Sequence, residues 1–143
     1  MESKNRSHCP VTYALDLIGD KWSLLMLRDI ILFDKKYYHE FTQSLEGIST
    51  NILANRLAML EGNGILLKVR DEQDKKRFIY SPTEKGLDLL PVIISMVLWS
   101  AKYDADTVAP LDEIKKIEQD PAAFMNKVRS KFSGEKMPDP VAL

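Results

Sequence analysis

The side chains with the most distinctive chemistry lie close together, where a helix is expected to begin at Thr50. The amides of Asn51 and Asn55 can each form two hydrogen bonds with adenine, and Arg56 can bind guanine or a phosphate. Ser49 is a preferred N-cap residue, and the free N–H groups of a helix N-terminus bind phosphate. Taken alone, each of these residues is better explained as an ordinary exposed helix residue. In the context of the elements around them, they predict contacts with double-stranded DNA.

A second candidate DNA contact is the basic group Lys75, Lys76 and Arg77, at the tip between two expected strands, Ile65–Arg70 and Arg77–Ser81. Strand, polar tip and strand together are typical of a β-hairpin. A solvated turn often carries such charges by chance, but a basic hairpin that follows a DNA-reading helix more readily contacts phosphates or the minor groove. The same tip holds acidic residues that weaken this interpretation: Asp71, Glu72 and Asp74.

Hydrophobic spacing predicts the elements that must position these side chains. Helices are expected at Pro10–Ile18, Lys21–Ile31, Tyr38–Leu45 and Thr50–Asn63. Gly47 lies in the tight turn before the last of them, where a residue that tolerates positive φ is needed. After the hairpin, Ser81 is expected to cap a long helix that runs to Tyr103, and two short amphipathic pieces follow. A short helix, a tight turn, a longer helix and a hairpin form the pattern of a winged helix-turn-helix.

The chain resembles the HxlR-type branch of the MarR-like winged-helix regulators of bacteria and archaea. The resemblance covers about Cys9 to Tyr103, roughly two-thirds of the chain. Its most specific parts are Ile18-Gly19-Asp20-Lys21-Trp22, Leu27-Arg28-Asp29, Gly47-Ile48-Ser49 and Thr83-Glu84-Lys85-Gly86. The resemblance implies a homodimer with two winged-helix heads that binds a palindromic operator, most simply as a repressor.

The segment Leu87 to Leu98 is apolar on nearly every side of the helix it is expected to form. Such a helix must be covered all round, and in a chain this small a partner subunit is the best cover. The alternative is the central core helix of a monomer. In similar proteins the first helix joins this interface, and the residues expected there are Leu15, Leu90, Ile93, Ile94, Val97 and Trp99.

Cys9 is the one cysteine of the chain and directly precedes the first helix, where the helix dipole lowers a thiol pKa. Several similar regulators sense oxidants or electrophiles through a cysteine at this place. Cys9 is therefore a candidate redox sensor that responds to an oxidant or an electrophile. An inert thiol packed at the interface explains it equally well. A small aromatic effector could also lie near Trp22, Tyr37 and Trp99, although such aromatics are more often core residues.

Composition excludes several other classes of protein. The net charge of −1 permits DNA binding without arguing for it, and no sequence motif for catalysis, a metal or a cofactor is present. A cytoplasmic DNA-binding regulator that is neither an enzyme nor a membrane protein is expected. The near-neutral charge leaves a winged-helix module for protein contacts, without DNA, as the alternative.

The predicted fold class is mainly α with a small β-hairpin, a winged helix-turn-helix that dimerises through its N-terminal and long C-terminal helices. Three segments are expected along the chain. Residues 1–8 form a flexible N-terminus, residues 9–104 form the winged helix-turn-helix domain with its dimerisation helices, and residues 105–143 form a helical extension with a frayed tail.

Overall fold

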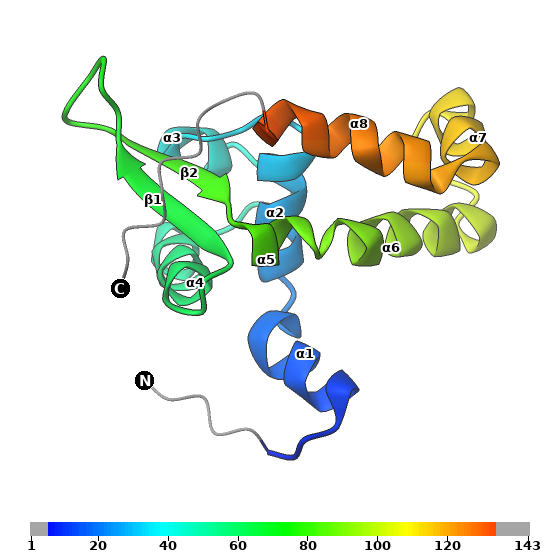
Figure 1. Cartoon of the computed structure of the whole chain (residues 1–143), viewed down its shortest axis with the longest axis horizontal. Coiled ribbons are helices and arrows are strands. Elements are labelled where there is room, and N and C mark those ends of the chain that lie inside the picture. The colour runs from blue at the N-terminus through cyan, green and yellow to red at the C-terminus, as the bar shows by residue number, and fades with distance from the viewer. Residues whose placement is uncertain (1–5, 134–143) are drawn as a thin grey trace. The chain divides into compact units, whose positions relative to one another are not determined.

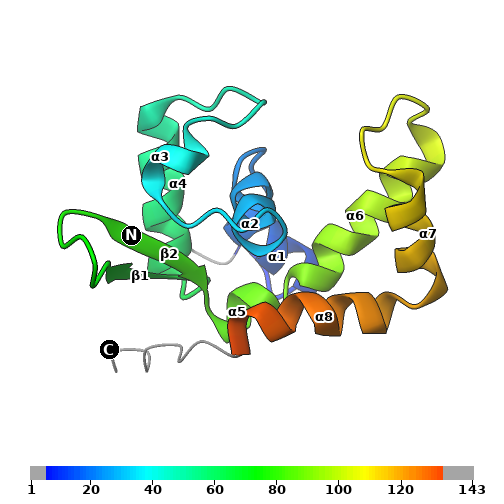
Figure 2. The same cartoon turned by 90° about the horizontal axis from the view of Figure 1, so that it is seen from above.

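The computed structural model describes residues 6–133, which contain eight helices and one two-stranded sheet (Figures 1 and 2). In chain order the elements are α1 (Pro10–Ile18), α2 (Ser23–Ile31), α3 (Tyr38–Phe41), α4 (Thr50–Gly62), β1 (Leu66–Arg70), β2 (Phe78–Pro82), α5 (Glu84–Leu87), α6 (Leu90–Tyr103), α7 (Leu111–Gln119) and α8 (Pro121–Ser133). Residue contacts divide the chain into two compact units, one up to Gly86 and one from Leu87 onward. The predicted frayed tail and most of the predicted flexible N-terminus lie outside the described residues.

The first unit is built around the apolar side of α4. Leu53, Leu57 and Leu60 are spaced at i, i+4 and i+7, and all three are buried, as this spacing predicts. Phe41 of α3 is also buried, and its ring meets that of Tyr80 on β2 edge to face at 6.0 Å. The helix α4 is thereby held on one side and leaves its other side free.

The antiparallel hairpin pairs Leu66 with Pro82 at its base and Arg70 with Phe78 near its tip. The backbone N–H of Tyr80 also donates to the carbonyl of Lys36 at 2.8 Å, so the chain before α3 pairs with β2. The hairpin therefore packs against α3 and α4, with β1 in contact with α4 and β2 in contact with α3 (Figure 1). The predicted strands are confirmed, although β1 begins one residue later than predicted and β2 begins and ends one residue later.

The turn between α3 and α4 contains Gly47 at φ +71°, which confirms the predicted positive φ. The predicted helix from Tyr38 to Leu45 is too long, because α3 ends at Phe41. Beyond Phe41 the hydrogen bonds are of the i to i−3 kind, and the side chain of Leu45 is 98% exposed instead of joining the core. The order helix, turn, helix and hairpin is that of a winged helix-turn-helix.

The long helix predicted after the hairpin differs from the structure at its start. Ser81 and Pro82 belong to β2, and Thr83 caps α5 in place of Ser81, its Oγ1 accepting from the Gly86 N–H at 3.1 Å. The helix is then interrupted before α6. Pro91 is the physical reason, because it has no N–H to donate to the carbonyl four residues earlier.

That carbonyl belongs to Leu87, and it accepts a hydrogen bond from Arg129 Nη1 of α8 at 2.9 Å. Arg129 Nη2 also pairs with Asp88 at 3.0 Å. In the second unit α6, α7 and α8 follow one another, and α8 runs back toward the start of α6 (Figures 1 and 2). Ile114, Ile117 and Val128 are buried in this unit.

By length and composition alone, the stretch Glu84–Tyr103 is long and apolar enough to cross a membrane. This is weak evidence for a membrane span, because the core helix of a soluble protein passes the same test.

Candidate nucleic-acid interface

The free side of α4 is small and polar. Ser49 caps this helix, and its Oγ accepts from the N–H of Ile52 at 3.3 Å. The side chains that α4 leaves exposed along this side are those of Thr50, Asn51, Ala54, Asn55 and Ala58. Four of the five predicted contacts on this helix, Ser49, Thr50, Asn51 and Asn55, are therefore exposed together at its N-terminal end.

Arg56, the fifth predicted contact on this helix, is placed differently. Its side chain is half-buried, its Nε lies 3.7 Å from Asp20 Oδ1, and its Nη1 lies 3.2 Å from Met59 Sδ. Burial raises the pKa of Asp20, but hydrogen bonds from Ser23 and Trp22 outweigh it and leave the pKa below its usual value. Asp20 therefore remains ionised beside Arg56, and the guanidinium ties α4 to the start of α2.

Two of the three acidic residues at the tip of the hairpin, Asp71 and Asp74, bind other residues of the tip, while Glu72 is exposed. Asp71 is buried and accepts from the Gln73 N–H at 3.0 Å and from Arg77 Nη2 at 3.1 Å. The Gln73 hydrogen bond is the largest cause of its lowered pKa. Asp74 accepts from the Lys76 N–H and pairs with Arg77 at 3.4 Å. Two of the three acidic side chains thus stabilise the turn. Because their charges are paired within the tip, they argue less strongly against contact with DNA.

Of the three predicted basic contacts at the tip, Lys75 and Lys76 are exposed. Arg77 is 43% exposed, is held by the two aspartates and lies 4.2 Å above the Tyr37 ring. Sequence reasoning missed Lys68 on β1, whose Nζ lies 4.3 Å above the Phe78 ring. Its position facing outward on an alternating strand was the available signal.

A groove of about 580 Å³ separates α4 from the hairpin. Small residues of α4, Ala54 and Ala58, line one side, and basic residues of the hairpin, Lys68, Lys76 and Arg77, line the other. Tyr37, one of the aromatics expected near a ligand site, also lines this groove. The small side chains of Ala54 and Ala58 leave the surface of α4 open on this side of the groove.

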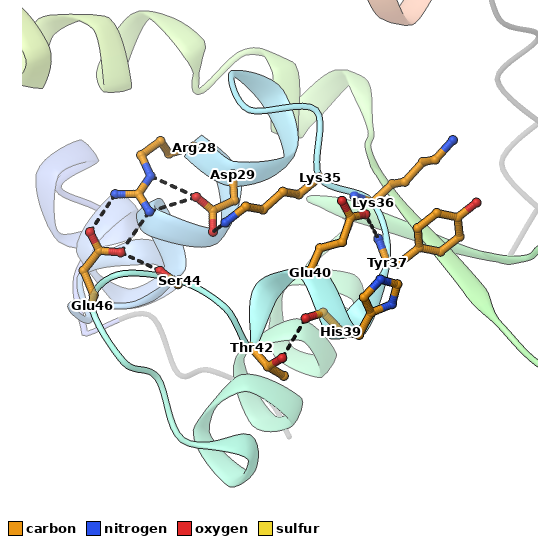
Figure 3. A network of polar contacts seen from close by, with 10 residues as sticks. All are labelled: Arg28, Asp29, Lys35, Lys36, Tyr37, His39, Glu40, Thr42, Ser44 and Glu46. Atoms are coloured by element: carbon orange, nitrogen blue, oxygen red, sulfur yellow. Dashed lines mark hydrogen bonds and ion pairs between the residues drawn. The ribbon is translucent and has the colours of Figure 1, made fainter.

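The turn before α4 is tied to α2 by a network of charges, drawn in Figure 3. Arg28 Nη1 and Nη2 each donate to one carboxylate oxygen of Glu46 at 3.0 Å. Ser44 donates to the same carboxylate at 2.5 Å. On its other side Arg28 binds the buried Asp29 at 2.8 Å, and Lys35 lies 3.3 Å from that carboxylate.

The network keeps Glu46 ionised. The hydrogen bonds from Arg28, and then from Ser44, lower the pKa of Glu46 to about 2. Those contacts in turn raise the pKa of Arg28, with the Glu46 hydrogen bond as the largest cause. Sequence reasoning missed this pair, because the two residues lie 18 positions apart and no local pattern joins them.

The six predicted interface residues differ in how far this chain buries them. Leu90, Ile93 and Ile94 are buried by the chain itself, so their side chains are not free to face a partner, while Val97 is half-buried. Leu15 is 54% exposed and Trp99 is 68% exposed. The exposed apolar side of α6 also includes Val92, Met96 and Tyr103, and Val92, Met96 and Trp99 line an open hollow with Pro91 and Ser95.

Cys9 is exposed and occupies the N-cap position of α1, as its place in the sequence predicts. Hydrogen bonds from the backbone of Thr12 and then of Val11 lower the pKa of its thiol. The thiolate is therefore favoured relative to an ordinary cysteine.

Comparison with known proteins agrees with this geometry. A family model described as HxlR-like helix-turn-helix matches residues 17–107. YdeP of Bacillus subtilis, named as an uncharacterized HTH-type transcriptional regulator, is 36% identical over 110 residues, which are 77% of this chain and 84% of that protein. The crystal structure of PA1607, a putative transcription factor, has a TM-score of 0.68 at 34% identity and covers 76% of both chains. The redox regulator HypR in its oxidized form has a TM-score of 0.57 at 30% identity, covering 66% of this chain and 96% of that one.

Proposed function

The chain belongs to the HxlR-like helix-turn-helix family of DNA-binding transcriptional regulators, and we propose that it represses transcription by binding a palindromic operator as a homodimer. The observation that carries this proposal is the exposed polar end of α4 beside a basic hairpin, both on the first unit. A regulator of this kind works on chromosomal DNA, which places it in the cytoplasm, and needs no catalytic step. Repression requires only that the dimer occupies DNA that polymerase must use.

The proposed contacts follow from where each side chain lies. An α-helix fits the major groove, so Asn51 and Asn55 face base edges there while Ser49, Thr50 and the helix N-terminus hold a phosphate. Lys75 and Lys76 at the hairpin tip follow the neighbouring backbone or minor groove. Arg56 and Arg77 are already paired with acidic residues, so we assign them the task of holding α4 and the tip in place.

The proposed dimer is formed by the exposed apolar side of α6. Val92, Met96, Trp99 and Tyr103 are between 41% and 68% exposed, which is unusual for large apolar side chains gathered on one helix. The exposed Val11, Tyr13 and Leu15 of α1 are the second candidate for this interface. Two identical heads, spaced about 34 Å apart, fit two half-sites one helical turn apart.

The proposed signal is oxidation of Cys9. The thiol is exposed and its pKa is lowered, and one similar structure is that of a regulator in its oxidized form. With one cysteine per chain, a disulfide would join the two Cys9 sulfurs of the dimer. The two thiols would lose two protons and two electrons to an oxidant such as diamide, which is reduced to the hydrazine.

The test begins with selection of duplexes from a randomised library by the purified protein, followed by fluorescence anisotropy with the selected and a scrambled duplex at several salt concentrations. We expect the selected duplex to be palindromic and to bind at least about a thousandfold more tightly than the scrambled one, with strong salt dependence. Diamide should weaken binding by the wild type and not by Cys9→Ser. Failure to enrich any duplex would refute the proposal and favour a protein-contact module.

A further inference from the structure

We propose that Glu46 is a positioning residue for DNA recognition, because its ion pair with Arg28 fixes the turn from which α4 projects. This inference rests on the proposed function and concerns the same interface. Glu46 does not touch DNA in this scheme. It acts through the placement of Ser49 and of the helix N-terminus that follows it.

The turn and the start of α4 have almost no apolar anchor. Phe41 and Leu53 are buried, but no residue from 42 to 52 is, and Leu45 is almost wholly exposed. This stretch includes the end of α4 that is proposed to meet DNA. Polar contacts must therefore help to fix its position. Apart from hydrogen bonds to residues within four positions along the chain, the polar contacts between this stretch and the other described residues are the Arg28 pair with Glu46 and a hydrogen bond of 3.2 Å from the Tyr38 hydroxyl to the Thr50 carbonyl.

Arg28 is held in place by contacts other than its pair with Glu46. Its Nε and Nη2 both bind Asp29, which is 2% exposed, and its guanidinium lies 5.2 Å from the Phe33 ring. A planar guanidinium held in this way has its three remaining N–H groups fixed in direction. Glu46 accepts from two of them, one on Nη1 and one on Nη2, so its carboxylate is placed in a single orientation, and Ser44 donates to the same carboxylate.

The direction in which DNA affinity changes when the Glu46 charge is removed distinguishes a positioning role from simple charge repulsion. Glu46 carries a negative charge three residues before Ser49, where a phosphate is proposed to bind. If its charge were all that mattered, its removal would strengthen binding to every DNA. If Glu46 positions the turn, its removal weakens binding to the selected sequence and leaves binding to other sequences unchanged or slightly stronger.

The experiment compares Glu46→Gln and Ser44→Ala with the wild type on a duplex selected by the wild type and on its scrambled counterpart. For Glu46→Gln we expect about tenfold weaker binding to the selected duplex, no loss on the scrambled one, and a lower ratio between them. Ser44→Ala removes one donor and keeps the carboxylate, so it should show a smaller change in the same direction. Circular dichroism would establish that both variants keep the wild-type helix content.

The matched control is Glu72→Gln, which removes one exposed acidic charge from the hairpin tip, outside the network. It should bind both duplexes equally or slightly more tightly. If Glu46→Gln behaves like this control, or loses affinity equally on both duplexes, the positioning role is wrong. If the wild type enriches no duplex, the proposed function itself fails, which is a separate and recognisable result.

Discussion

Two helices of this chain, α4 and α6, each leave a face uncovered, and the two faces have opposite chemistry. All the exposed side chains of α4 except Ile52 are small or polar, with Asn51 and Asn55 at its N-terminal end. The exposed side chains of α6 include a row of large apolar ones, with Met96 and Trp99 at its centre. Both helices are buried on their other side, so the difference is not a matter of packing within the chain.

The difference indicates two kinds of partner. A face of short polar side chains loses little entropy on binding and suits a charged, hydrated surface such as DNA. A face with an exposed tryptophan and methionine gains free energy only when water is removed from it, as between protein subunits. The following predictions test this contrast, beginning with the largest expected effect.

Trp99→Glu should disrupt the apolar face of α6 most severely. Burying a carboxylate without a partner in the interface costs free energy, so the variant should be a monomer where the wild type is a dimer. Size-exclusion chromatography and light scattering measure this difference. Affinity for a palindromic duplex should fall by at least about a hundredfold, because two linked heads bind far more tightly than one. Leu111→Glu, at another exposed apolar position of the second unit, is the control that should remain dimeric. A dimeric Trp99→Glu would contradict the assignment of this face.

Asn51→Ala combined with Asn55→Ala should disrupt the polar face of α4 without affecting the dimer. Loss of two base contacts of about 1 to 3 kcal/mol each predicts at least about thirtyfold weaker binding to the selected duplex. Anisotropy measures this loss, and light scattering checks the dimer. Asn126→Ala on α8 replaces an exposed asparagine that belongs to neither face and should change neither DNA affinity nor the dimer. Equal binding by the double variant would mean that α4 does not read bases.

Lys75→Ala combined with Lys76→Ala should weaken binding several-fold on every sequence. The two ammonium groups are proposed to contact the backbone, so the slope of log affinity against log salt should fall by about one for each. Lys127→Ala, an exposed lysine of α8, should leave that slope unchanged. A loss confined to the selected duplex would instead assign these lysines to base recognition.

The smallest expected effect is on stability at acid pH. It tests the ion pair between Arg28 and Glu46, which holds the turn before α4, and does not involve the exposed face of α6. The pKa of Glu46 is lowered to about 2, so its ion pair adds stability above the ordinary pKa of 4.5, and that contribution is lost as the pH falls through about 2. The contribution is below about 1 kcal/mol, because the pair is partly exposed. Thermal unfolding of wild type and Glu46→Gln should differ slightly at pH 6 and converge near pH 2. A constant difference across this range would exclude the ion pair as its cause.

Local patterns in the sequence predicted much of the fold. The bounds of α1, the cap at Ser49 and the buried stripe of α4 depend on residues within a few positions of one another, and all three are confirmed. The N-cap at Ser81 is wrong because pairing with β1 continues the strand to Pro82, a competition that no local pattern records.

The site was predictable in its residue types but not in its internal pairing. The inward orientation of Asp71 depends on residues that folding brings together. The same holds for the ion pairs of Arg56 with Asp20 and of Arg28 with Glu46. Sequence spacing placed Arg56 with the polar residues of α4, although its pairing with Asp20 holds it against the start of α2. The assignment of each side chain to DNA or to a partner subunit stays a prediction until the variants are measured.

The interruption before α6 has a consequence for the order in which the molecule is completed. Pro91 leaves the Leu87 carbonyl without its usual donor, and Arg129 supplies one from 42 positions later in the chain. During synthesis the DNA-reading unit leaves the ribosome well before Arg129 does. The junction between α5 and α6 is therefore among the last parts of the described chain to gain its final hydrogen bonds. A newly made chain would have its DNA-reading head formed before the helix that carries its proposed partner surface is secured.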